Sequence, residues 1–133
     1  MIAYDTNVLI YAFEGSGPWA GLAQAVVRQG EQEGAVLSVL TWQELMAGVT
    51  LRQGSAQDQL GQALGSLAAA RFVPVTQAIC DRAVALTKQY GKSVYGYDAI
   101  HLATALVHKA QVFITNDKAL RAISVAGLEI RGL

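Results

Sequence analysis

Four acidic residues stand where apolar segments end or where helices should begin, and they carry the clearest chemistry of the chain: Asp5, Glu44, Asp98 and Asp117. In an α/β fold, such positions meet at the carboxyl edge of a parallel sheet. Four carboxylates gathered there repel one another unless a cation lies between them, and hard oxygen ligands favour Mg²⁺ or Mn²⁺. The pattern therefore predicts a metal site.

Three of the four acids also have a structural explanation of their own. Asp5 can cap the helix that follows it, and Glu44 stands three residues after Thr41, where a capping-box glutamate belongs. Asp98 can be an acid favoured by the positive end of a helix. The helix behind Asp98 is apolar on nearly every face, however, so a carboxylate at its mouth needs a partner. The metal site is favoured because sheet topology brings all four acids to one edge.

Polar neighbours are placed to support these carboxylates. Thr6 or Asn7 can hydrogen-bond Asp5 or cap the next helix, and Thr115 and Asn116 precede Asp117 and can orient it or a water on the metal.

Other side chains offer contacts to a polyanion. Tyr95 and Tyr97 flank Gly96 just before Asp98, where they can stack on a base or simply pack. His101 lies one helical turn after Asp98 and either bonds a carboxylate or phosphate or sits at the core edge. The candidate phosphate contacts are Lys92, Lys118 and Arg121, although for each of them alone ordinary solvated charge is the favoured explanation.

The order of elements predicts an α/β fold with a short, mostly parallel sheet of about five strands and helices on both faces. A proline in the third strand favours an edge position. The expected strands are 2–4, 35–39, 72–75, 112–115 and 128–130. The expected helices are 7–13, 19–32, from a Thr41 cap to 52, 57–70, 78–90, 97–109 and 118–125.

Length and composition indicate one domain over residues 1–133. Hydrophobic residues make up 53% and charged residues 15%, which suggests a surface partly covered by a partner and a homodimer. Trp19 and Trp42 are assigned to the core or to a subunit contact, and Cys80 to a buried, inert thiol. No stretch is long and apolar enough to cross a membrane and no leader precedes Asp5, so a cytoplasmic location is expected.

Charge is uneven although the total is zero. Residues 1–67 carry a net charge of about minus four and residues 68–133 about plus four. A basic flank beside an acidic metal centre suits a polyanionic substrate, while ordinary solvent-facing charge explains the asymmetry equally well.

Four segments together resemble the signature segments of the PIN-domain nucleases, and most of all the VapC-type toxins of bacterial toxin–antitoxin pairs. The resemblance runs in family order from Asp5 to Asp117. The segments are Asp5-Thr6-Asn7-Val8-Leu9-Ile10-Tyr11, Thr41-Trp42-Gln43-Glu44-Leu45-Met46-Ala47-Gly48, Tyr97-Asp98-Ala99-Ile100-His101-Leu102-Ala103-Thr104-Ala105 and Thr115-Asn116-Asp117.

This resemblance implies a three-layer α/β/α sandwich, a Mg²⁺- or Mn²⁺-dependent endoribonuclease and an antitoxin that blocks its site. It also implies that Asp5, Asp98 and Asp117 bind the metal, with Glu44 binding directly or through water. Some members carry a further acid after the fourth, where this chain has Lys118 and Ala119, so the number of metals stays open. Attack by metal-activated water would leave 5′-phosphate and 3′-hydroxyl ends.

Three other functions are weighed against this one. A haloacid dehalogenase-type phosphatase needs a second aspartate two residues after the first, and position 7 is asparagine. A receiver domain needs a paired acid at the first strand and an aspartate after the third, and Val75-Thr76-Gln77 supplies none. A degenerate PIN-like module that binds RNA or protein without cutting is disfavoured, because all four acids are present.

Overall fold

A computed structural model describes residues 1–51, 54 and 70–133 of the chain. Its centre is a five-stranded sheet in the order β3-β2-β1-β4-β5, and every neighbouring pair runs parallel. The strands are β1 (Ile2–Tyr4), β2 (Ala35–Ser38), β3 (Ala70–Val73), β4 (Val112–Ile114) and β5 (Glu129–Arg131). The expected five-strand α/β fold is confirmed, and β3 lies at an edge of the sheet as expected. Its expected bounds of 72–75 are wrong, however, because β3 ends at Val73 and Pro74, which has no amide hydrogen to donate, follows it.

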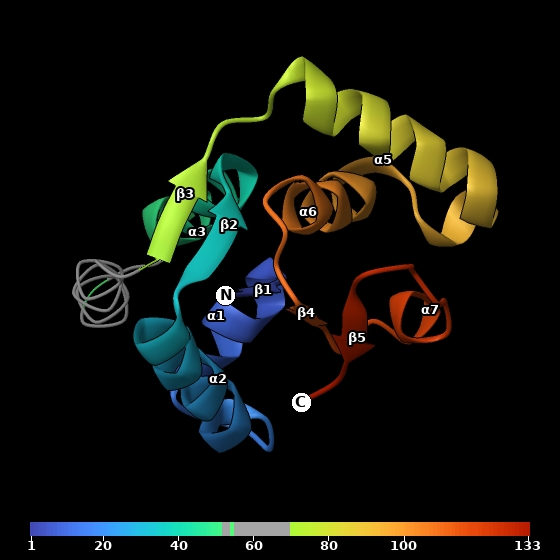
Figure 1. Cartoon of the computed structure of the whole chain (residues 1–133). Coiled ribbons are helices and arrows are strands. Elements are labelled where there is room, and N and C mark those ends of the chain that lie inside the picture. The colour runs from blue at the N-terminus through green and yellow to red at the C-terminus, as the bar shows by residue number, and fades with distance from the viewer. Residues whose placement is uncertain (52–53, 55–69) are drawn as a thin grey trace.

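Helices connect the strands and cover the sheet on both sides (Figure 1). Helices α1 and α2 lie on one side of the strands, and α5 and α6 lie on the other. The helices are α1 (Thr6–Glu14), α2 (Ala20–Glu33), α3 (Val39–Leu51), α5 (Gln77–Tyr90), α6 (Gly96–Val107) and α7 (Lys118–Arg121), with a 3₁₀ turn η1 (Gly91–Ser93).

The core is divided by the sheet into two layers, because successive strand residues point to opposite faces. In β1, Ile2 and Tyr4 pack with α1 and α2, whereas Ala3 packs with α5 and α6. Strands covered on both faces need apolar side chains at every position, which explains their short, continuous apolar runs.

Register at the centre of the sheet fixes where the first and last acids meet. The pairing of β1 with β4 places Tyr4 opposite Ile114, so the next residues, Asp5 and Thr115, emerge side by side. The connections from β1 and β4 lead toward opposite sides of the sheet order, which makes this edge a topological switch point where open α/β sheets hold their ligands.

The third helix begins earlier than expected. Val39 is the first residue of α3 and not the last of a strand, and the Ser38 hydroxyl accepts a hydrogen bond from the Leu40 amide at 3.1 Å. The expected Thr41 cap is therefore wrong, because Thr41 already lies inside the helix. Glu44 is then a residue of the second helical turn, and the capping-box explanation for it fails.

Several smaller expectations also change. The exposed fractions of Trp19 and Trp42 are 40% and 42%, so neither belongs to the core, and the subunit contact stays a prediction. Cys80 is half-buried, and α7 ends at Arg121 and not at Val125. The helix expected over 57–70 lies outside the described residues, apart from Ala70, which begins β3.

Among the helices of the described ranges, none combines the length and apolar character needed to cross a membrane. The assignment of residues 1–133 to one domain stays a prediction.

Candidate active site

Asp5 sits at the junction of β1 and α1, where both of its carboxylate oxygens are engaged. One oxygen accepts a hydrogen bond from the Val8 amide at 3.3 Å and caps α1, and the other accepts from the Thr115 hydroxyl. The side chain is buried. Burial raises the pKa of Asp5, and the hydrogen bonds from Thr115 and Val8 oppose that rise. Asp5 is thus both a helix cap and a carboxylate held at the sheet edge.

Thr115 connects the acids that follow β1 and β4. Its hydroxyl donates to Asp5 and accepts from the Asp117 amide at 3.0 Å. Asp117 is exposed, and one of its oxygens accepts from the Leu120 amide at 3.0 Å, which caps α7. The fully buried Thr115 side chain therefore sets the spacing between Asp5 and the residue that carries the Asp117 carboxylate.

Glu44 reaches the same edge from α3 and is paired with His101 of α6. His101 Nε2 lies 3.5 Å from Glu44 Oε1, and the His101 side chain is buried. The hydrogen bond from His101 is the main cause that lowers the pKa of Glu44, and one from Thr6 adds to it. Glu44 is therefore ionised at neutral pH, and His101 faces a carboxylate, one of the two roles considered for it.

Asp98 lies in the first turn of α6, and its carboxyl group interacts electrostatically with all three other acids. Although much of the side chain is exposed, partial desolvation on the cavity wall is the largest influence that raises its pKa. The charges of Asp117, Asp5 and Glu44 raise the pKa further, and only His101 opposes them. The four carboxylates thus share one electrostatic environment.

A cavity of about 250 Å³ opens between α1, α3 and α6. Three of the four acids line it together with the two polar residues that open α1. Its described lining residues are Asp5, Thr6, Asn7, Glu44, Tyr97, Asp98 and His101.

Oxygen donors dominate this cavity, which suits a hard divalent cation. In the described part of the chain, no three acidic, histidine or cysteine side chains are already drawn together closely enough to hold a metal. Asp5, Glu44 and Asp117 are each held by hydrogen bonds, whereas Asp98 is exposed in the first turn of α6. The chemistry of these oxygen donors therefore fits a hard metal ion.

Asn116 differs from the role expected for it. Its Oδ1 accepts a hydrogen bond from the Leu133 amide at 3.0 Å, so the side chain ties the segment after β5 to the end of β4. Nothing in the described structure shows it orienting Asp117 directly.

The candidate nucleic-acid contacts separate into two groups. Tyr97 lines the acid cavity, and Tyr95 lines a neighbouring groove. Lys92, Lys118 and Arg121 are exposed and do not belong to the described cavity lining, and the Arg121 guanidinium lies against Gly132.

Thr41 is a site residue that the sequence did not reveal. Its hydroxyl is fully buried and lies 3.1 Å from the Thr6 hydroxyl, which in turn hydrogen-bonds Glu44. The available signal was its spacing, because residues three apart on a helix share a face, so Thr41 and Glu44 point the same way.

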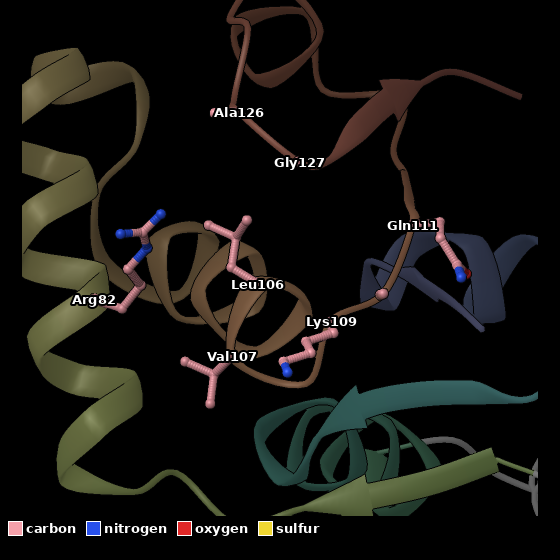
Figure 2. Close-up of a pocket in the computed structure, with 8 residues that line it drawn as sticks. Arg82, Leu106, Val107, Lys109, Gln111, Ala126 and Gly127 are labelled. Atoms are coloured by element: carbon pink, nitrogen blue, oxygen red, sulfur yellow. The ribbon is translucent and has the colours of Figure 1, made fainter.

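A second cavity, of about 350 Å³, lies at the other end of α6 (Figure 2). Figure 2 shows Arg82 extending from α5 beside Leu106, with Ala126 and Gly127 across the cavity. Its described lining holds Arg82 and Lys109 but no carboxylate. This cavity is chemically distinct from the acid cavity.

Comparison with known proteins gives a family match over almost the whole chain. The family model described as PIN domain matches residues 2–126. A search of curated proteins finds no match.

Solved structures resemble the chain along nearly its full length. A chain of a toxin–antitoxin complex from Klebsiella pneumoniae is 28% identical, with a TM-score of 0.72 and coverage of 96% of this chain and 95% of that one. A chain of FitAcB from Neisseria gonorrhoeae is 25% identical, with a TM-score of 0.74 and coverage of 98% and 96%. A chain of VapBC2 from Rickettsia felis, bound to a promoter DNA fragment, shares the fold at 17% identity, with a TM-score of 0.73 and coverage of 99% and 98%.

Proposed function

Because the chain belongs to the PIN domain family, we propose that it is a metal-dependent endoribonuclease and the VapC-type toxin of a toxin–antitoxin pair. The observation that carries this proposal is the convergence of Asp5, Glu44 and Asp98 on one cavity. There, desolvation first and then the charges of the other three acids raise the pKa of Asp98. A cavity that concentrates negative charge in this way binds a hard cation more readily than it binds an anion unaided.

The roles of the acids follow from how each is held. Asp5, Asp98 and Asp117 would bind Mg²⁺ or Mn²⁺, and Glu44 would bind it directly or through water. When bound, the ion supplies Lewis-acid activation of water and neutralises the charge of a phosphodiester. Thr115 holds Asp5, while Thr6 and His101 hold Glu44, so these residues fix the carboxylates before substrate arrives.

RNA is the proposed substrate because of the charge distribution and the family. The acid cavity carries an exposed tyrosine, Tyr97, and the second half of the chain supplies the excess of basic residues. Ends with 5′-phosphate and 3′-hydroxyl groups are expected, because attack on phosphorus by a metal-activated water, and not by the ribose 2′-hydroxyl, would expel the 3′-oxygen.

A protein antitoxin is the proposed partner, since the similar chain from Klebsiella pneumoniae comes from a structure described as a toxin–antitoxin complex. A homodimer is also proposed, because Trp42 and other large apolar side chains are exposed on the described surface. The cytoplasmic location stays a prediction.

The decisive variant is Asp5→Asn, which removes one charge at nearly constant shape. It should lower RNA cleavage at least roughly a hundredfold, because a charged ligand contributes several kcal/mol to the transition state. Cleavage of a defined single-stranded RNA in Mg²⁺, with sequencing of the ends, measures this. Asp81→Asn, on an exposed face of α5, is the matched control and should cut normally.

A non-cutting RNA- or protein-binding module is the second candidate, and the separation of the acids in the described structure favours it. The same experiment distinguishes the two functions. If RNA cleavage by the purified protein survives in Asp5→Asn, or if the ends carry 2′,3′-cyclic phosphate, the metal-nuclease proposal is wrong. If the wild type binds RNA but never cuts it, the second candidate holds.

A further inference from the structure

An apolar groove of about 560 Å³ runs between α5 and the beginning of α6, beside the acid cavity. Ala83, Val84 and Ile100 form its apolar walls, and Tyr95 and Lys88 also line it. The exposed fractions of Val84 and Tyr95 are 69% and 72%, which is high for apolar and aromatic side chains. The groove is therefore a preformed apolar surface that the proposed catalytic chemistry does not use.

The groove and the acid cavity are lined by consecutive residues of one segment. Tyr95 and Gly96 line the groove, and the next two residues, Tyr97 and Asp98, line the acid cavity. Consecutive Cα atoms are only about 3.8 Å apart, so the linings of the two sites meet at the start of α6. Gly96 has φ +60° and carries no side chain, and the space where a Cβ would lie is open for 4 Å. No side chain of Gly96 therefore stands between the groove and the acid cavity.

We propose that this groove binds a nucleobase of the RNA strand, next to the phosphodiester in the acid cavity; this inference rests on the proposed function. The Tyr95 ring offers a flat face for stacking, which tolerates any base because every base has a π-face. Val84 and Ile100 cover the base edge, and the Lys88 ammonium compensates the phosphate charge that accompanies it.

The junction with the acid cavity is what favours RNA as the occupant. An apolar side chain of a protein would also fill the groove. A single strand whose phosphodiester is held in the acid cavity through a bound cation, however, would carry its neighbouring base to Tyr95 without a further binding event. Lys88 adds charge complementarity to a polyanion.

The test uses full-length protein in an Asp5→Asn background, so that RNA is not consumed, and measures binding of a labelled 12-nucleotide single strand. Tyr95→Ser should weaken RNA binding by about five- to a hundredfold, the range for one lost stacking contact. Tyr95→Phe should bind normally, and Val84→Ser and Lys88→Ser should each weaken binding. Val107→Ser and Lys109→Ser are the matched controls, because they line the distant second cavity, and they should bind normally.

Direct contact is tested by scanning a single abasic nucleotide along the same RNA. At one position, the abasic RNA and Tyr95→Ser should each weaken binding, and their combination should weaken it no further. Additive losses at every position would overturn the assignment. So would a change of oligomeric mass on gel filtration in Tyr95→Ser, because the groove would then be a contact between copies of the chain.

Failure of the two proposals is distinguishable, because binding is measured without cleavage. An RNA that is bound with coupling at Tyr95 but is never cut by the wild type overturns the nuclease and leaves the groove assignment intact. An RNA that is cut normally by Tyr95→Ser, at unchanged affinity, overturns the groove assignment and leaves the nuclease intact.

Discussion

The repulsion between Asp98 and the other three acids should lower the stability of the metal-free protein. The pKa of Asp98 in the folded chain lies above the ordinary value of 3.8, because desolvation and the charges of Asp117, Asp5 and Glu44 oppose its ionisation. At neutral pH the ionised carboxylate therefore destabilises the fold. This penalty disappears as pH falls through the raised pKa, because the folded state then takes up a proton before the unfolded state does.

Asp98→Asn should consequently raise the melting temperature of the metal-free protein at pH 7. We expect about 1–3 °C, a small rise because an exposed carboxylate is screened by solvent. Thermal unfolding in EDTA across pH measures the difference, which should vanish below the ordinary pKa of Asp98. Added Mg²⁺ should stabilise the wild type more than the variant, because binding to the folded state raises its stability.

Asp81→Asn provides the comparison for this effect, since Asp81 is exposed on α5 and accepts a hydrogen bond from Gln77 at 3.0 Å. Its melting temperature should rise with Mg²⁺ as much as that of the wild type, because the acid cavity is unchanged. A lower melting temperature for metal-free Asp98→Asn at pH 7 would contradict repulsion as the dominant effect.

In helix α3, the residue that caps the helix and the residue that supports the site are different. Ser38 precedes the helix and accepts from the Leu40 amide, whereas Thr41 lies inside it beside Thr6. Ser38→Ala should lower the free energy of unfolding by about 1 kcal/mol and leave the Mg²⁺ requirement for cleavage unchanged. Thr41→Val should increase the Mg²⁺ concentration needed for half-maximal cleavage, because Thr6 then loses its partner and holds Glu44 less well.

Urea unfolding and Mg²⁺ titration of cleavage separate the two variants. If Ser38→Ala alone shifted the Mg²⁺ requirement, Glu44 would depend on where the helix begins and not on the Thr41 to Thr6 contact.

The central strands were predictable because their burial on both faces leaves an unbroken apolar run, as in Ile2 to Tyr4. The end of β2 was not, because Val39 is apolar and β-branched and continues the run, while the serine hydroxyl before it starts the helix. Helix α5 was placed well, since Thr76 caps it through the Ile79 amide and Gly91 ends it.

Some contacts of the candidate site were likewise predictable from the sequence, and others were not. Asp5 and Thr115 were predictable as neighbours, because parallel strands end at one edge. The pairing of Glu44 with His101 was not, because it joins two helices whose relative rotation depends on packing that a single sequence does not report. For Trp42 the sequence left the core and a subunit contact open for a related reason: its apolar character does not tell whether this chain or another molecule covers it.

The whole molecule offers an apolar stripe on α3 that would suit a second copy. Val39, Trp42 and Met46 recur at helical spacing and have exposed fractions of 40%, 42% and 36%. We expect sedimentation at about twice the chain mass of 14.1 kDa, and a shift toward the monomer in Trp42→Ser. Trp19→Ser is the comparison, because Trp19 is similarly exposed but lies just before α2, away from the α3 stripe, and this variant should keep the mass of the wild type. A wild type that sediments as a monomer at every concentration would contradict the dimer.

The parallel pairing of β1 with β4 also determines when during synthesis the site can form. Asp5 and Thr115 are 110 residues apart in sequence, yet one hydrogen-bonds the other at the heart of the site. A ribosome needs roughly 5 to 20 seconds to make that much chain, and β1 lacks its central neighbour until then. The site therefore cannot close until residue 115 has been made, so under the proposed function the growing chain would cut no RNA for most of its own translation.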